Sequence, residues 1–394
     1  MNITLYQIAE RNALSKKQRN LIDRRTFDEQ ILQQRTLIDR KCREWGYSKS
    51  RDSKIQHIIF EALSKKIDLN NIFEPLQVLD PDAGVYTTMF RDDSIYSKPL
   101  LVKIANPNEA VFPYEGADAI IEGYVGVMLN KLRDKIKNFV FTHAIFHCGI
   151  AIQKLNGDYM WCSQRGTQDY VITEFIQEAN ELKEYVKECD SKTLMIILLQ
   201  VACALRLAKM ELNFSHNDLW SPNVLVQEFE RPRSIKLYTP SGIKIIKTQY
   251  FANIIDFGFS SVNINKNERV GIFHVPETEH LRDCQITEDF HYLLIDLYIE
   301  LSDHTKFYEN SKDKPDGDFV EIEDLDEIEE SMECKKLLEE IFKFYTSEKL
   351  SYWNKFTSKV KRYRRLPRVK NEIKVFDEII NGMIDMNIVK MIDG

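Results

Sequence analysis

Nine residues, His216-Asn217-Asp218-Leu219-Trp220-Ser221-Pro222-Asn223-Val224, carry most of the information in this chain. One carboxylate, Asp218, stands five positions before a carboxamide, Asn223. Thirty-three residues later comes a second carboxylate, Asp256, in an Ile-Asp-Phe-Gly sequence. In Mg²⁺-assisted phosphoryl transfer, one Asp orients the nucleophile and accepts its proton, while an Asn and another Asp hold the metal ions. The three side chains have the types and the order that this chemistry requires.

Each motif alone has a simpler explanation. Asp-Phe-Gly is a common turn, because Asp and Gly both favour turns. His-x-Asp followed by Asn at this interval is rarer, and here both motifs follow hydrophobic runs. Their spacing and order match the protein-kinase motifs H-R-D-x-x-x-x-N and D-F-G. On these residues the chain resembles a eukaryotic-type Ser/Thr protein kinase.

The resemblance implies an α+β fold of two lobes, a small β-rich N-lobe at residues 71–176 and a larger helical C-lobe at 177–394. Residues 1–70 lie outside it, and apolar residues at helical spacing predict a helical extension there. This extension carries 15 Lys and Arg against 9 Asp and Glu. Two helices packing on the main domain explain it; a basic segment that binds an acidic partner or anchors to a virion is the alternative. The two apolar stripes are Phe27, Ile31, Ile38, Cys42 and Trp45, and Ile55, Ile59, Leu63 and Ile67.

The residue pattern after position 70 agrees with two lobes. Short β-rich segments separated by Asp, Pro and Gly surround a predicted helix at 117–135. Residues 226–252 predict a hairpin insertion; haspin and kinases of large DNA viruses, which this chain resembles most, carry a comparable one. Residues 313–330 hold ten acidic side chains and predict a solvated loop.

Composition limits the class of protein. Of the 394 residues, 43% are apolar and 11% aromatic, as in a globular protein. The longest apolar run, around Leu194–Leu205, is interrupted by Gln200, so no membrane span is predicted. The N-terminal residues do not read as a secretory signal. Seven Cys without a CxxC motif predict reduced thiols in a cytoplasmic compartment, and the net charge of −7 argues against a general nucleic-acid binder.

A kinase needs a strand lysine that holds the α- and β-phosphates, paired to a glutamate on the following helix. Lys103, in Leu-Val-Lys-Ile-Ala, has this setting, although a surface lysine at a strand edge is the alternative. Glu122 is the expected partner, with Glu109 and Glu115 as rivals.

The nucleotide-binding segments are weakly marked. Where G-x-G-x-x-G is expected, only Gly84 is present, followed by Val85 and by Tyr86 at the expected aromatic tip. Because glycine lets backbone N–H groups approach phosphates, this loop is predicted to be stiffer than usual. By order along the chain, backbone groups of Glu174 and Ile176 are expected to bind the adenine base.

Three further positions bear on regulation and anchoring. Asn217 stands where the resemblance implies an arginine, and a neutral amide cannot form a charge-assisted pair with a phosphorylated activation loop. We therefore expect activity without such phosphorylation. Asp289 resembles a buried aspartate that anchors the catalytic loop, the name used here for residues 216–223. Val275-Pro276-Glu277 resembles A-P-E, with an ordinary turn as the alternative.

Together these features predict an ATP- and Mg²⁺-dependent kinase for Ser/Thr hydroxyls of protein substrates, in the cytoplasm, or in a host cell or virion if the chain is viral. Asp218 would take the hydroxyl proton, Asn223 and Asp256 would bind Mg²⁺, and Lys103 held by Glu122 would bind the phosphates.

Two other functions stay open. A small-molecule kinase of the choline or aminoglycoside type often has an H-N-D loop, as here, but Phe-Gly after the second Asp argues against it. A pseudokinase scaffold would explain the missing glycines, but a scaffold does not need Lys103, Asp218, Asn223 and Asp256 together.

Overall fold

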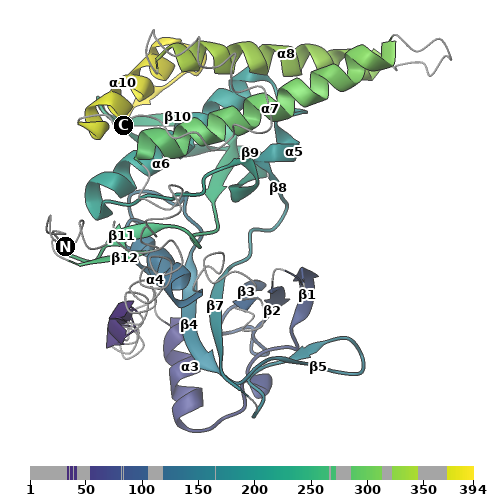
Figure 1. The fold of residues 1–394 in the computed structure, drawn as a ribbon, viewed down its shortest axis with the longest axis vertical. Helices are drawn as coiled ribbons and strands as arrows, with labels where there is room; N and C mark the ends of the chain where they lie inside the picture. Colours follow the sequence, from purple (N-terminus) through teal and green to yellow (C-terminus); the bar gives the residue numbers. More distant parts are fainter. Residues whose placement is uncertain are drawn as a thin grey trace, which may run out of the picture.

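The chain contains a sheet-rich part and a helix-rich part (Figure 1). The computed structural model describes residues 54–80, 82, 84–104, 119–164, 166–265, 268–271, 285–312, 322–344 and 371–394, and seven residues between 33 and 41. Within these residues the structure mixes α-helices and β-strands, as the sequence predicts.

The sheet-rich part is built on five antiparallel strands. Their order is β1 (Gln77–Asp80), β2 (Val85–Thr88), β3 (Leu100–Ile104), β7 (Gln168–Glu174) and β4 (Thr142–Cys148). Side chains of a strand alternate between the two faces of a sheet. In β3, therefore, Leu100, Val102 and Ile104 are buried on one face and Lys103 lies on the other.

Two helices cover opposite faces of this sheet. α3 (Lys54–Ser64) shares a buried cluster with Phe146, and α4 (Ala119–Asn130) shares another with Ile145, the neighbouring residue of β4. A Cβ on Gly123 of α4 would lie 2.9 Å from the side chain of Ile145. The missing side chain at Gly123 therefore lets α4 lie directly on the strands.

The outer edge of the sheet at β4 is covered by one amide of α3. Gln56 is fully buried; its Nε2 donates to the carbonyl of Ile145 (2.8 Å), and its Oε1 accepts from the N–H of Ile145 (2.6 Å). Edge strands otherwise present unpaired backbone groups. Gln56 satisfies both backbone groups of Ile145.

The structure describes only some residues of the two apolar stripes expected in the N-terminal region. Ile38, Ile55 and Ile59 are buried, whereas Ile67, beyond the end of α3, is 44% exposed. The second stripe therefore packs as predicted only where it is helical. Phe27, Ile31, Cys42 and Trp45 lie outside the described residues.

α6 (Ser191–Leu212) is the central helix of the helix-rich part. Asp190 caps its first turn by accepting from the N–H of Thr193 (2.6 Å), and Asn213 ends it with a φ of 48°. Among the described helices, α6 is long and apolar enough to cross a membrane by length and composition alone, but most of it is buried within the protein. Gln200, which interrupts its apolar run, is buried and donates to the carbonyl of Tyr250 (3.0 Å). The apolar content of α6 is therefore explained by its position as a buried core helix.

A second sheet holds the long hairpin expected at 226–252. Its strand order is β13 (Ile392–Asp393), β10 (Gly242–Ile254), β9 (Val224–Thr239) and β8 (Ala179–Glu181). β9 begins directly after Asn223, β10 ends two residues before Asp256, and the N–H of Ile255 donates to the carbonyl of Asn223 (3.0 Å). The open end of the hairpin therefore brings the two candidate metal ligands together.

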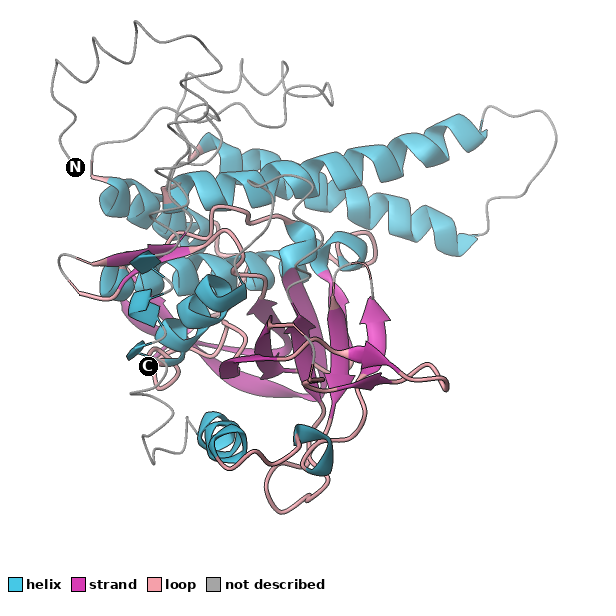
Figure 2. Cartoon of the chain, turned by 60° about the horizontal axis from the view of Figure 1, so that its bottom comes forward, coloured by secondary structure: helices cyan, strands magenta, loops and turns pink. Residues whose placement is uncertain are grey.

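α7 (Ile286–Lys312) and α8 (Ile322–Lys343) run side by side and extend beyond the rest of the molecule (Figures 1 and 2), while α10 (Glu372–Asp385) packs on α6 and α7. The solvated loop predicted at 313–330 is wrong for residues 322–330, because α8 begins at Ile322. Those residues include no Gly or Pro, and Glu is a good helix former. Negative charge alone does not exclude a helix.

The cysteines also differ from prediction. Cys148, at the end of β4, and Cys162, after β6 (Tyr159–Met160), form a disulfide with Cα atoms 5.1 Å apart. The expectation of reduced thiols throughout is wrong for this pair. Their separation of 14 residues in the sequence did not predict the disulfide. The chain turns back through β5 (Ile152–Gln153) and β6, and this turn brings the two cysteines together. Cys189, Cys203 and Cys334 are buried free thiols.

We predict that His143→Phe weakens the acid sensitivity of the fold. His143 is 9% exposed, its ring lies 4.7 Å from that of Phe141, and its Nε2 has no partner among the described residues. Burial lowers the pKa of His143 to about 3. Below pH 6.5 the unfolded chain therefore binds a proton here that the folded chain rejects, and stability falls as the pH decreases from 6.5 toward 3. At pH 5 the loss is about 2 kcal/mol.

The measurement is urea unfolding near neutral pH and near pH 5. The difference between the two unfolding free energies should shrink by that amount in His143→Phe. It should stay unchanged in Leu155→Phe, which introduces the same side chain at a fully exposed position and removes no titratable group. Identical pH dependence in His143→Phe and the unaltered chain would contradict the prediction.

Candidate active site

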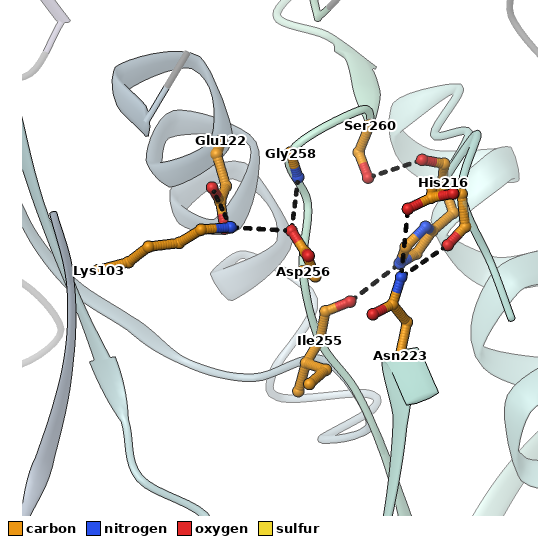
Figure 3. Close-up of polar contacts among 9 residues, drawn as sticks. Lys103, Glu122, His216, Asn223, Ile255, Asp256, Gly258 and Ser260 are labelled. Carbon is orange, nitrogen blue, oxygen red and sulfur yellow. Dashed lines mark hydrogen bonds and ion pairs between the residues drawn. The ribbon is translucent and has the colours of Figure 1, made fainter. Parts of the chain in front are cut away.

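Lys103 extends toward Glu122 and Asp256 in the candidate site (Figure 3). Its Nζ is 2.9 Å from Oε2 of Glu122 and 3.0 Å from Oδ1 of Asp256. Burial alone would lower the pKa of Lys103, but the two carboxylates outweigh burial and raise it above its usual value. One charged lysine therefore joins β3, α4 and the segment after β10.

Glu122 reaches Lys103 from α4 and is 7% exposed. Burial raises the pKa of Glu122, and the charge of Lys103 opposes this. A buried charge that loses its partner is strongly destabilising, so each residue of the pair keeps the other in place. The rival partners Glu109 and Glu115 lie outside the described residues.

Asp256 is held in an uncommon backbone conformation, with a φ of 59°. Its Oδ1 also accepts from the N–H of Gly258 (3.2 Å). Burial would raise the pKa of Asp256, but Lys103 and this N–H group lower it. The described residues that bind the carboxylate use Oδ1, and the side chain is 41% exposed, so Oδ2 can accept a further ligand.

Asp218 and Asn223 lie together beside this group. Nδ2 of Asn223 donates to the backbone carbonyl of Asp218 (2.8 Å) and lies 3.5 Å from its Oδ2. With the amide nitrogen used in this way, the amide oxygen of Asn223 points away from Asp218. Burial raises the pKa of Asp218, although His216 opposes it. A carboxylate with a raised pKa is a better proton acceptor near neutral pH.

His216 connects the two halves of the site. Its Nε2 donates to the carbonyl of Ile255 (3.0 Å), the residue before Asp256, and its own carbonyl accepts from Oγ of Ser260 (3.1 Å). Since a carbonyl can only accept, Nε2 carries the proton. Burial lowers the pKa of His216, and the charge of Asp218 opposes this. The loop that carries Asp218 is thereby fixed to the strand end that carries Asp256 (Figure 3).

Two aspartates of α7 anchor the catalytic loop. Asp289, fully buried, accepts from the N–H groups of His216 and Asn217, both at 2.8 Å. This is the contact expected of it, although burial raises its pKa to about 7. Asp296 accepts from the N–H of Ser221 (3.1 Å) and from its Oγ (2.5 Å). We did not anticipate Asp296, yet its signal was present: seven residues after Asp289, it lies on the same face of the helix.

Asn217 fastens the segment after Gly258 through its own side chain. It has a φ of 67°, and its Nδ2 donates to the carbonyl of Phe259 (2.7 Å). The position where the resemblance implies an arginine therefore has a backbone partner in this chain. The Val275-Pro276-Glu277 motif lies outside the described residues.

Gly84 and Val85 lie beside Lys103 across the sheet. Val85 pairs with Lys103, and Gly84 has a φ of 65°, with its backbone so close to β3 that a Cβ would lie 2.2 Å from the carbonyl oxygen of Ile104. The expectation of Tyr86 at the aromatic tip of this loop is wrong, because Tyr86 lies within β2. Tyr86 is 7% exposed and packs with Tyr159, because strand alternation turns it to the face covered by α3.

Glu174 ends β7 where the adenine contact is expected. Its N–H donates to the carbonyl of Phe141 (2.9 Å), and its carboxylate accepts from Arg133 (2.9 Å) and from the N–H of Phe141 (2.7 Å). The N–H group of Glu174 is therefore already used within the protein. Ile176 is half-buried against the main core.

The donor set suits Mg²⁺ bound together with phosphates. The described residues contain no group of three His, Cys, Asp or Glu side chains that could hold a metal ion alone. Mg²⁺ commonly binds through one or two protein oxygens and completes its shell with water and substrate phosphates. Oδ2 of Asp256 and the amide oxygen of Asn223 are two such oxygens.

Comparison with known proteins gives partial matches to viral proteins. "Probable kinase 098L" of Invertebrate iridescent virus 3 is 30% identical over 141 residues, which are 35% of this chain and 23% of that protein. "Uncharacterized protein 035R" of the same virus is 29% identical over 167 residues, 38% of this chain and 15% of that protein. The chain thus spans less than a quarter of either relative. No family model matches it.

Solved structures add little. Two structures titled as the Rad53 kinase domain and SCD2, one of them in complex with AMPPNP, match 48% of this chain and 51% of their own. Their identities are 16% and 14%, with TM-scores of 0.26 and 0.27. TM-scores this low do not establish a shared fold.

We predict that Asp289→Ala destabilises the protein by about 2–5 kcal/mol, because two buried N–H groups lose their acceptor. Urea unfolding would measure the change in unfolding free energy. Asp303→Ala is the matched control, since Asp303 is an exposed residue of the same helix. Equal stability of the two variants would show that Asp289 does not anchor the loop.

Proposed function

We propose that this chain is a protein kinase that transfers the γ-phosphate of ATP to Ser or Thr hydroxyls of protein substrates. The observation that carries the proposal is the contact of Lys103 with both Glu122 and Asp256, beside the Asp218–Asn223 pair. A lysine held by a helix glutamate, next to two Mg²⁺-binding groups, positions a triphosphate in kinases. The partial similarity to a probable viral kinase supports phosphotransfer.

The transfer step assigns a role to each polar group. Asp218 would orient the acceptor hydroxyl and take its proton as the hydroxyl oxygen bonds to the γ-phosphorus and the bond to ADP breaks. Lys103 would bind the α- and β-phosphates, with Glu122 holding it in place. Mg²⁺, bound by Asn223 and Asp256, would neutralise charge on the phosphates.

The nucleotide would lie between the five-stranded sheet and the sheet that holds the β9–β10 hairpin. Gly84 and Val85 would face the phosphates from β2, next to Lys103. Backbone groups at Glu174 and Ile176 would meet the adenine base; for Glu174 this leaves the carbonyl, because its N–H is bonded to Phe141.

We further propose a kinase of the haspin-like or large-DNA-virus type, acting in the cytoplasm of a host cell or in a virion. The long β9–β10 hairpin and the two partial matches to an iridescent virus support this. The basic N-terminal region is suited to an acidic partner.

A small-molecule kinase is the second candidate, and one observation favours it. The H-N-D sequence at Asn217 is typical of choline and aminoglycoside kinases, and the neutral side chain of Asn217 bonds to the carbonyl of Phe259. The nature of the acceptor separates the two candidates.

We predict that purified protein with labelled ATP and Mg²⁺ labels itself or a generic acceptor protein, and that Asp218→Asn reduces the turnover by about 10³-fold. The variant loses the proton acceptor but keeps the phosphate contacts, so its thermal stabilisation by an ATP analogue should persist. Asp303→Asn, at an exposed site, is the control. Equal labelling by Asp218→Asn would refute the assignment; transfer only to small alcohols or amines would favour the second candidate.

We also predict full activity without phosphate on the chain. Asn217 bonds to the carbonyl of Phe259 and offers no positive charge for a phosphate to pair with. Phosphatase-treated protein, shown by intact mass to carry no phosphate, should keep the turnover of untreated protein. Protein that stays inactive until its loop is phosphorylated would overturn this expectation.

A further inference from the structure

The N-terminal region contacts a strand next to the candidate site. Oε1 of Gln34 accepts from the N–H of Gly271, in β12 (Arg269–Gly271), at 3.0 Å. Gln34 is 7% exposed, and the two residues are 237 positions apart in the sequence. Buried backbone groups are almost always paired, and here the partner of Gly271 comes from outside the kinase-like region.

β12 is connected to the catalytic loop through hydrogen bonds of its partner strand. It pairs with β11 (Ser261–Asn263), and Ser261 exchanges two backbone hydrogen bonds with Ser215, at 3.0 and 2.9 Å. Ser215 precedes His216 in the sequence. Gly271 lies tightly on β11, since a Cβ there would be 2.3 Å from Ser261. The contact of Gln34 therefore supports two strands and the loop bonded to them.

The same N-terminal segment also meets α4, the helix that carries Glu122. Ile38 is fully buried and belongs to the main core cluster, which also contains the apolar residues of α4. Burial and the nearby charge of Lys41 lower the pKa of Lys131, which follows the end of α4. Figure 1 shows this purple segment next to α4. One short stretch of chain thus bonds to β12 and lies next to α4, and both of these elements border the site.

We propose that the seven described residues between 33 and 41 form an intramolecular brace that holds α4 and β11–β12 in place through Gln34 and Ile38. Its catalytic consequence rests on the proposed function. The brace would keep Glu122 in contact with Lys103 and would hold the catalytic loop in position. Phosphorylation of an activation loop would then not be needed. Gln34 is then a positioning residue that touches neither substrate nor metal.

The buried amide of Gln34 is the more specific of the two contacts. Any docked helix would bury an apolar residue such as Ile38. An apolar residue in place of Gln34, however, would leave the N–H of Gly271 without an acceptor, which is unfavourable in a buried site. Gln34 therefore gives the brace a defined position on β12.

The test uses two full-length variants, Gln34→Met and Gln33→Met. Methionine keeps the length of the side chain and removes the acceptor, and Gln33 is an exposed neighbour on the same segment. Hydrogen exchange of peptides covering β12, α4 and β7 is measured together with thermal unfolding and turnover.

In Gln34→Met, exchange at β12 should rise about tenfold, the effect of losing one hydrogen bond. A smaller rise is expected at α4, none is expected at β7, and turnover should fall in parallel. Gln33→Met should behave as the unaltered chain. A uniform rise over all peptides, or none at β12, would overturn the brace. A rise at β12 without loss of turnover would overturn its positioning role.

The exchange result also stands apart from the proposed function. If the unaltered chain transfers no phosphate but Gln34→Met still loosens β12 and α4, the kinase proposal fails while the brace stands. If transfer is observed but exchange and turnover are unchanged in Gln34→Met, the brace fails while the kinase proposal stands.

Discussion

A partly buried ammonium group, that of Lys103, sets the geometry of this site. A charge taken out of water is costly unless it is paired, and Lys103 meets the requirement with two carboxylates from different parts of the chain. α4 must then lie close enough to the sheet for Glu122 to reach, which the missing side chain at Gly123 permits. Asp256 must turn back toward the sheet, which its positive φ achieves.

The helix-rich part supplies a frame for the remaining groups. α7 presents Asp289 and Asp296 to backbone groups of the catalytic loop, so the loop is held by acceptors on a rigid helix. The β9–β10 hairpin performs a similar task for Asn223 and Asp256, because its paired residues extend to Val224 and Ile254, next to both. Neither candidate metal ligand depends on a free loop for its position.

Much of this could be predicted from local sequence, and the reasons are physical. β3, α4, α6 and the hairpin have apolar periodicity and turn residues that act over a few positions, so their existence followed from the residues. The grouping of Asp218, Asn223 and Asp256 could be predicted because the spacing of their two motifs was informative. Asp296 was missed although its spacing from Asp289 was visible.

Contacts between distant segments could not be derived in this way. The pairing of Cys148 with Cys162, the burial of Tyr86 and the reach of Gln34 to Gly271 depend on how the strands and turns fold back. The helix at 322–330 was missed for another reason: charge density was weighed above helix propensity. Tertiary arrangement, which no local pattern records, decided the first three.

The position of Gln56 has a consequence for how copies of this protein behave in a crowded solution. The outermost strand of a sheet is a template on which a foreign strand can grow, and long open edges promote aggregation. At Ile145 the template is interrupted, since a side-chain amide mimics the next strand at that one position. Sheet growth from molecule to molecule is hindered there by a single residue of α3, the helix that covers the sheet face opposite Lys103.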